Sequence, residues 1–139
     1  MKALADRRAR VARVRRVQHL QAVGAAAAAE GKLVTLEDNA ARLTMLRQSL
    51  ARGEGDATGA VLGSIGELSM RLDEARSGLA KAIGQAREIV ALRSDERRDA
   101  HIARESAERL QGRAVADLQR AIEERMTASI RPRMAKNHG

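Results

Sequence analysis

Nine apolar residues between positions 61 and 89 constrain this chain more than any other feature. The steps between them alternate four and three without interruption, which is the spacing of the a and d positions of a heptad repeat. The nine are Val61, Ile65, Leu68, Leu72, Ala75, Leu79, Ala82, Ala86 and Ile89. Because only another helix lying along such a seam buries it, we expect two long helices packed together. A weaker continuation runs through Arg93, Glu96, Ala100, Ala103, Ala107 and Leu110.

The composition favours an elongated all-α coiled coil over a globular fold. The 139 residues include no Phe, Tyr or Trp, which bring the largest buried areas to globular cores. The single proline is Pro132, so the interior is free of the strongest helix breaker. No run of alternating β-branched residues predicts a strand. We therefore predict one all-α coiled-coil domain over residues 1–139.

A cluster of three glycines with Asp and Thr in residues 52–59 divides the chain. We expect a first helix over about residues 2–51, a turn at 52–59, a second helix over about 60–130, and a basic tail at 131–139 after Pro132. A short turn between two long helices predicts an antiparallel two-helix coiled-coil hairpin.

The ends of the helices carry capping signals. Gly53 suits the left-handed C-terminal cap of the first helix, and Asp56 or Thr58 suits the N-terminal cap of the second. Ser64 and Glu67 have the spacing of a capping box. If the chain pivots near residue 54 or 55, position i of the first helix faces a position near 110 − i of the second.

The first helix begins with an arginine-rich stretch around a thin apolar stripe at Val11, Val14 and Val17, continued by Leu20 and Val23. Such a basic helix suits a membrane surface or nucleic acid. We favour the alternative that the valines join the seam and the arginines flank it in solvent. A clear three and four pattern then returns at Leu33, Leu36, Ala40, Leu43 and Leu50.

The charge is uneven, with +7 of the net +8 in residues 1–52. This asymmetry indicates either an anionic partner or a basic face turned toward carboxylates of the second helix. The arginines concerned are Arg7, Arg8, Arg10, Arg13 and Arg15, and the carboxylates are Asp95, Glu96, Asp99, Glu105 and Glu108. Arg outnumbers Lys 22 to 4, a bias typical of GC-rich genomes, so the arginine excess is a weak indicator of nucleic-acid binding.

About the last 20 residues of the second helix have no first helix to lie on in this register. Their apolar residues shift by a stutter through Leu110, Ala114, Leu118 and Ile122, with Met126 and Ile130 nearby. The stretch is either a frayed, solvated tail or a binding surface for a partner, which we favour.

The sequence carries no signature of catalysis, so we expect neither an enzyme nor a cofactor. There is no Cys, and His101 and Glu105 share a helix face without a third metal ligand. No apolar stretch approaches the roughly 20 residues that span a bilayer. The N-terminus has no apolar region typical of a secretory signal, so we expect a cytoplasmic protein.

Over essentially its whole length the chain resembles the FliJ family of flagellar export proteins. The resemblance is carried by the arginine-rich Lys2–Arg16, the leucines of 33–50, the Gly53–Gly59 turn and the seam from Val61 onward. It implies a stalk similar to the γ subunit of rotary ATPases, working in flagellum biogenesis and type III protein secretion. The family often places an aromatic residue in its gate-contacting patch, whereas this chain has none.

The resemblance also implies partners and their contact residues. The helix ends would enter the hexameric flagellar export ATPase, at Arg7, Arg8, Val11, Val14, Leu118, Ile122, Met126 and Ile130. The segment after the turn would contact the cytoplasmic domain of the export gate, at Leu62, Ile65, Leu68, Met70 and Leu72. Export chaperones are a further implied partner. Such a protein would lie in the cytoplasm at the inner-membrane export apparatus, and would reach the membrane only through its partners.

Two other functions are open at this point. One is a nucleic-acid-binding coiled coil that uses the arginines of 7–16, although the chain lacks aromatic residues for base stacking. The other is a structural homodimer in which the second helix pairs with its own copy. We favour the export stalk.

Overall fold

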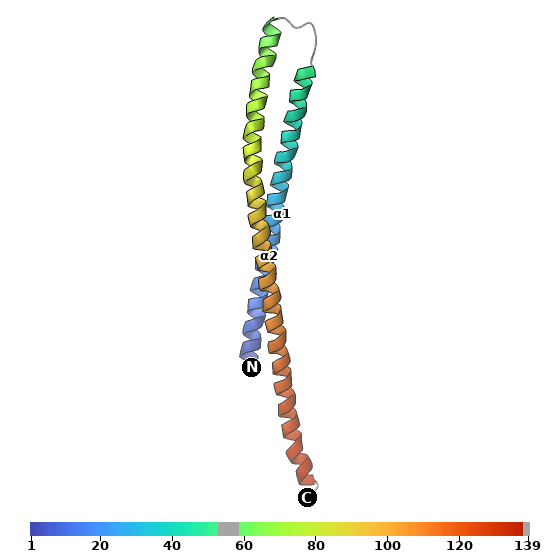
Figure 1. The fold of residues 1–139 in the computed structure, drawn as a ribbon. Coiled ribbons are helices and arrows are strands. Elements are labelled where there is room, and N and C mark those ends of the chain that lie inside the picture. The colour runs from blue at the N-terminus through green and yellow to red at the C-terminus, as the bar shows by residue number, and fades with distance from the viewer. Residues whose placement is uncertain (53–58, 138–139) are drawn as a thin grey trace. The chain divides into compact units, whose positions relative to one another are not determined.

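The computed structural model contains two α-helices and no strand among the residues that it describes. It describes the backbone of residues 1–52 and 59–137, and the side chains in these ranges up to residue 130. Helix α1 is Lys2–Arg52 and helix α2 is Gly59–Asn137 (Figure 1). The predicted all-α class is confirmed, and the first helix has the expected extent.

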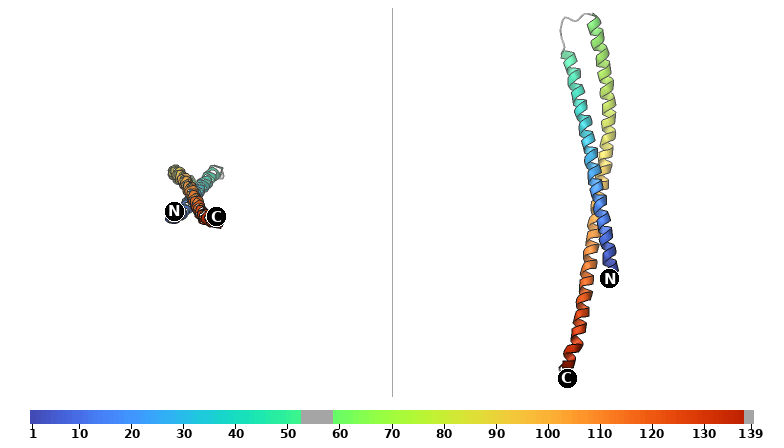
Figure 2. Two further views of the ribbon diagram at one scale, coloured as in Figure 1. Left: turned by 90° about the horizontal axis from the view of Figure 1, so that it is seen from below. Right: turned by 180° about the vertical axis from the view of Figure 1, so that it is seen from behind.

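The helices form two compact units, each made of a segment of α1 and a segment of α2. Unit 1 comprises Met1–Val23 and Glu96–Gly139, and unit 2 comprises Gly24–Asp95. Within each unit the two segments lie side by side and run in opposite directions (Figures 1 and 2). The prediction of an antiparallel two-helix hairpin is confirmed.

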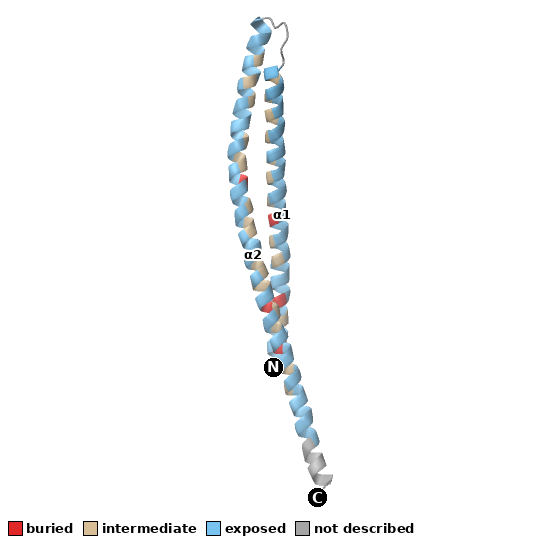
Figure 3. Ribbon diagram, turned by 45° about the vertical axis from the view of Figure 1, so that its right-hand side comes forward, coloured by how far each residue is buried: buried red, intermediate tan, exposed pale blue. Residues whose placement is uncertain are grey.

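The buried positions of α1 follow a heptad spacing, and Figure 3 shows the buried and intermediate residues as patches along the helices. Steps of three and four connect them, with only the exposed Arg15 out of the series. The positions in this series are Ala5, Arg8, Ala12, His19, Ala22, Ala26, Ala29, Leu33, Leu36, Ala40, Leu43, Arg47 and Leu50, and the half-buried Ala9 and Thr44 lie directly beside it. This alternation keeps one face of a helix turned toward its neighbour.

The expected valine stripe of α1 is not part of this seam. Val14, Val17 and Leu20 are 54%, 53% and 68% exposed, so the prediction that they join the seam is wrong. The reason is geometric. A constant step of three turns back by about 60° each time on a helix of 3.6 residues per turn, so the series winds around the helix.

Five of the nine predicted seam residues of α2 are confirmed. Ile65, Leu72, Leu79, Ala82 and Ala86 are half-buried or buried, whereas Val61, Leu68, Ala75 and Ile89 are exposed. Residues seven apart follow one another along a helix and form a column. The second column that faces α1 lies one residue after the column of Leu68, at Ser69, Ile83, Val90, Arg104, Gln111 and Leu118. Helix α2 has three neighbouring columns of mostly apolar or small residues, and α1 covers two of them.

The seam of α2 continues without the expected stutter. The buried or half-buried positions Ala107, Gln111, Ala114, Leu118 and Ala121 keep the alternation of four and three, whereas Leu110 and Ile122 are exposed. The predicted stutter is therefore wrong, because it followed apolar residues that lie beside the seam.

The pairing register also differs from the prediction. In unit 2, Arg47 pairs with Asp73 and Glu37 with Arg87. In unit 1, Arg16 pairs with Glu108. The residue numbers of these pairs add to 120 or 124, so the predicted sum near 110 is wrong by at least ten residues. The first turns of α2 thus lie beyond the end of α1, and α1 accompanies α2 about ten residues further than expected.

The structure also differs from the prediction at both ends of α2. The helix begins at Gly59, and the Ser64 hydroxyl donates to the Ala60 carbonyl at 3.1 Å inside the helix, so Ser64 is not an N-terminal cap. At the other end the helix continues through Pro132 to Asn137, because a proline removes one backbone hydrogen bond without preventing those that follow. The caps assigned to Gly53, Asp56 and Thr58 lie outside the described residues.

We expect the seam to decide stability in unit 2. Replacing the half-buried Leu43 by Ala removes packed methyl groups, and should lower the free energy of unfolding by about 1–3 kcal/mol. Met45, two residues along the same helix, is 69% exposed, so Met45→Ala should change it by less than about 0.5 kcal/mol. Urea unfolding followed by circular dichroism measures both. Equal effects of the two substitutions would contradict the observed seam.

Candidate partner-binding surfaces

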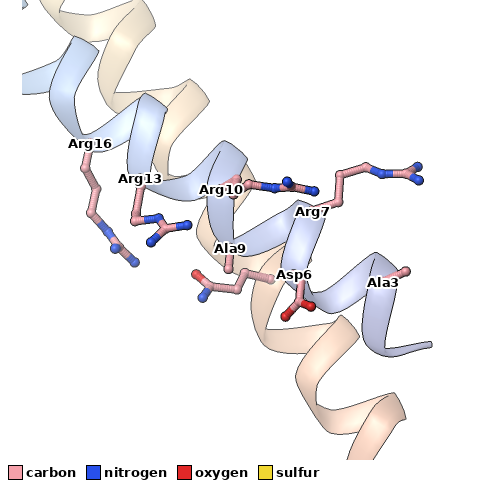
Figure 4. A pocket seen from close by; sticks show the side chains of 8 residues that line it. Ala3, Asp6, Arg7, Ala9, Arg10, Arg13 and Arg16 are labelled. Atoms are coloured by element: carbon pink, nitrogen blue, oxygen red, sulfur yellow. The ribbon is translucent and has the colours of Figure 1, made fainter.

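An open groove with a volume of about 660 Å³ lies along the N-terminal segment of α1 in unit 1. Its lining residues are Ala3, Asp6, Arg7, Ala9, Arg10, Arg13 and Arg16 of α1 and Gln111 of α2 (Figure 4). Steps of three place the four arginines on successive turns. Because each step turns back by about 60°, the row winds part of the way around α1 from Arg7 to Arg16.

The groove is cationic because most of its arginines are unpaired. Arg7, Arg10 and Arg13 form no ion pair with another described residue, and Asp6 is the only carboxylate in the lining. Figure 4 shows Arg13 and Arg16 extending side by side, while Arg7 points away from Asp6. Guanidinium groups arranged in this way suit carboxylate or phosphate groups of a partner.

Arg16 differs from the other three because it binds α2. Its Nε donates to a Glu108 carboxylate oxygen at 2.9 Å. This hydrogen bond is the main cause that lowers the pKa of Glu108 below its usual value of 4.5. The pair joins the two helices and is partly exposed, so it fixes the register more than it stabilises the unit.

A pair of histidines lies across the seam of unit 1. The rings of His19 in α1 and His101 in α2 have centroids 5.5 Å apart and are tilted by 49°. Together with Val23, Arg97 and Arg98 they line a second open groove of about 360 Å³.

Each ring nitrogen of His101 has a neighbour on its own helix. An Arg104 terminal nitrogen lies 3.2 Å from His101 Nδ1, and His101 Nε2 lies 3.1 Å from a Glu105 carboxylate oxygen. Because an arginine only donates, Nδ1 accepts and Nε2 carries the proton that Glu105 binds. The expectation that His101 and Glu105 share a helix face is confirmed.

His19 is surrounded by positive charge. Its pKa is lowered from 6.5, first by burial in the seam and then by Arg104, His101 and Arg97, while Glu108 acts in the opposite direction. The neutral imidazole is therefore the form that the folded unit 1 favours.

Beyond Leu118 and Ala121, α2 of unit 1 runs past the start of α1 (Figure 1). Ile122, Met126 and Ile130 are 48%, 61% and 51% exposed there. Because they are spaced by four residues, they follow one another along one side of the helix. They form a narrow apolar strip that no other described segment covers.

In unit 2, apolar residues gather where α1 ends. Leu46, Ser49, Leu50, Ile65, Leu68 and Leu72 line an open groove of about 360 Å³ between the two helices. Leu62 and Met70, which are 58% and 64% exposed, are not part of this lining. The groove contains no charged side chain, so it suits an apolar partner.

The structure brings together some of the predicted contact residues and not others. Ile65, Leu68 and Leu72 share the groove of unit 2. In unit 1, Arg7 lines the arginine groove, while Arg8 occupies a half-buried seam position, and Val11 and Val14 are 40% and 54% exposed outside the groove lining. Leu118 is half-buried in the seam, apart from the exposed strip.

Several site residues were missed from the sequence. The assumed register places His19 opposite position 91, so its approach to His101 was not predicted. Arg10, Arg13 and Leu46 were also left out of the predicted contacts. The step of three from Arg7 to Arg16 was a visible signal for the arginine groove, whereas the histidine pair depends on the register alone.

No protein family, curated protein or solved structure matches this chain. Among the described residues, no helix is long and apolar enough to cross a membrane.

The histidine pair predicts a pH dependence of stability. The folded pKa of His19 is below the unfolded value near 6.5, so its neutral form contributes stability that is present above pH 6.5 and is lost as the pH falls toward the folded pKa. We expect the free energy of unfolding to fall more steeply between about pH 7 and pH 5 in the natural chain than in His19→Gln. Urea unfolding across this pH range measures the two slopes. Identical slopes would contradict the environment described for His19.

Proposed function

We propose that this chain is a non-enzymatic stalk or adaptor of the flagellar type III export apparatus, coupling an export ATPase ring to the export gate. The observation that carries the proposal is the pairing in unit 1. The arginine-rich start of α1 lies against the C-terminal half of α2, so the cationic groove and the apolar strip at Ile122, Met126 and Ile130 belong to the same unit.

This combination suits a partner that surrounds the helix ends. The unpaired Arg7, Arg10 and Arg13 would bind acidic residues lining the ring, while the strip would pack against apolar ones. A pair of helices in such a ring can change which subunits close on nucleotide only if it binds their conformations with different affinities. Coupling would therefore depend on both kinds of contact.

The second contact would lie in unit 2. The groove with Ile65, Leu68 and Leu72 offers aliphatic side chains to the gate's cytoplasmic domain. The exposed Leu62 and Met70 lie outside its lining on the same helix and offer further ones. Aliphatic contacts here would take the place of the aromatic residue that members of the resembled family often carry.

The experiment uses the purified chain, the export ATPase and the gate's cytoplasmic domain from the same organism. Charge reversal of Arg7, Arg10 and Arg13 to Glu should weaken binding to the ATPase at least about tenfold, because each lost charge-assisted hydrogen bond contributes about 1.5–3 kcal/mol. The matched control reverses three exposed arginines of unit 2, Arg42, Arg52 and Arg71, and makes the same change in net charge. Isothermal titration calorimetry at moderate salt measures each affinity.

In the same titrations, Leu62→Asp with Met70→Asp should abolish binding to the gate domain and leave ATPase binding unchanged. A chain that binds neither partner would contradict the proposal. So would one that loses ATPase affinity equally with both arginine triples. Binding of duplex DNA with a steep salt dependence, without ATPase binding, would assign the arginine groove to nucleic acid instead.

A further inference from the structure

The two flanks of the seam in unit 2 differ in chemistry. One flank carries the ion pairs between the helices: Arg47 with Asp73 at 3.3 Å and Glu37 with Arg87 at 3.5 Å. Hydrogen bonds and opposite charges satisfy the polar groups on that side.

The other flank is apolar and largely uncovered, and we call it the apolar flank. It consists of Leu46 of α1 and Leu68, Ala75, Ala82 and Ile89 of α2, of which only Ala82 is half-buried. Leu46, Leu68 and Ile89 are 55%, 46% and 43% exposed. Leu68, Ala75 and Ile89 are members of the predicted seam that α1 leaves open, so the contact with α1 explains only part of the uninterrupted apolar spacing of the sequence.

The apolar flank is also hollowed. The groove lined by Leu46, Ser49, Leu50, Ile65, Leu68 and Leu72 lies between the two helices at one end of the flank. Side chains of another helix lying along the flank would fill it, as knobs fill holes between packed helices.

We propose that the apolar flank is a self-association surface, which joins two copies of this chain antiparallel about a two-fold axis into a four-helix bundle. The order of side-chain sizes supports a second copy as the occupant. Along α2 the column reads large, small, small, large, at Leu68, Ala75, Ala82 and Ile89.

This order is the same in both directions. In an antiparallel pair of α2 helices, Leu68 of each copy faces Ile89 of the other, and Ala75 faces Ala82. An isologous interface needs such self-complementarity, because every contact occurs twice. The central alanines let the two helices approach closely while the large residues pack at both ends.

The size of the flank agrees with a dimer. The 22 residues from Leu68 to Ile89 extend over about 33 Å, and two helices side by side are about 20 Å wide. The contact would therefore bury about 1,300 Å² in total, inside the ~1,200–2,000 Å² range of specific interfaces.

The inference does not rest on the proposed export function. Leu68 belongs both to the apolar flank and to the predicted gate contact, so the dimer and the gate complex would exclude each other at this residue. Self-association would then control access to the gate-contacting residues.

Sedimentation equilibrium of the full chain, recorded by interference because the chain lacks aromatic residues, tests the proposal. The natural chain should dimerise in a concentration-dependent way. Ile89→Glu should raise the dimer dissociation constant at least about tenfold, because the charge would be buried unpaired. The matched control is Ile102→Glu, 13 residues along α2, 56% exposed and about 140° around the helix from Ile89, which should change it less than about threefold.

A charge pair tests the antiparallel contact directly. Leu68→Glu alone and Ile89→Lys alone should each weaken the dimer, whereas a chain carrying both should recover it, because each Glu then faces a Lys of the other copy. Circular dichroism confirms that all variants keep their helices.

Three outcomes would overturn the proposal. The first is a natural chain that stays monomeric up to about 1 mM, a concentration at which even weak specific association is visible. The second is an equal effect of Ile89→Glu and Ile102→Glu, which would place the contact elsewhere. The third is a double variant no better than either single variant, which would exclude the antiparallel pairing of α2.

Discussion

The close contact of two helices through alanine is the interaction on which the rest of the structure depends. All six buried hydrophobic residues among the described ones are alanines: Ala5, Ala12, Ala26, Ala86, Ala107 and Ala114. A methyl group contributes little buried area, so no single residue holds the pair together. Stability instead comes from many small contacts repeated along the seam, and that repetition requires steps of three and four.

The two units use this seam differently. In unit 2, leucine, isoleucine and valine are interspersed with alanine, and ion pairs lie on one flank. In unit 1 the seam also contains Arg8, His19, Arg104 and Gln111 at half-buried positions. The Arg104 Nε is buried without a hydrogen-bond partner among the described residues, which is unfavourable. Unit 1 therefore combines a weaker seam with the cationic groove, and unit 2 a stronger seam with the apolar flank.

The sequence was sufficient to predict the fold class, the extent of α1 and the antiparallel pairing, because these follow from the absence of strand signals and from the cluster of glycines in residues 52–59. It was not sufficient to predict which columns of α2 meet α1. Leu68 and Ser69 are adjacent, and the apolar Leu68 seemed the better seam residue, yet Ser69 lies against α1. The predicted register was wrong for a related reason. A cluster of glycines in the sequence indicates where the chain reverses, but it does not indicate how many residues of α2 precede the first one that faces α1.

The more a candidate site depends on the register, the less of it was predicted from the sequence. The arginines of the groove all lie on one helix, so the spacing of Arg7 and its neighbours was visible in the sequence. The apolar groove of unit 2 was found in part, through Ile65, Leu68 and Leu72, while Leu46 from the other helix was missed. The histidine pair needs the correct alignment of both helices and was missed entirely.

The most direct test of this account is the pairing register within one chain. The chain contains no Cys, so Glu37→Cys with Arg87→Cys creates one defined pair for a short bifunctional thiol crosslinker. Because Glu37 and Arg87 form an ion pair across the helices, we predict rapid crosslinking within single chains at low protein concentration. Glu37→Cys with Asp73→Cys is the comparison, since position 73 lies on the same side of α2 as position 87 and about 21 Å from it along the helix. Faster crosslinking of the 37 and 73 pair, or crosslinking only between chains, would contradict the structure described here.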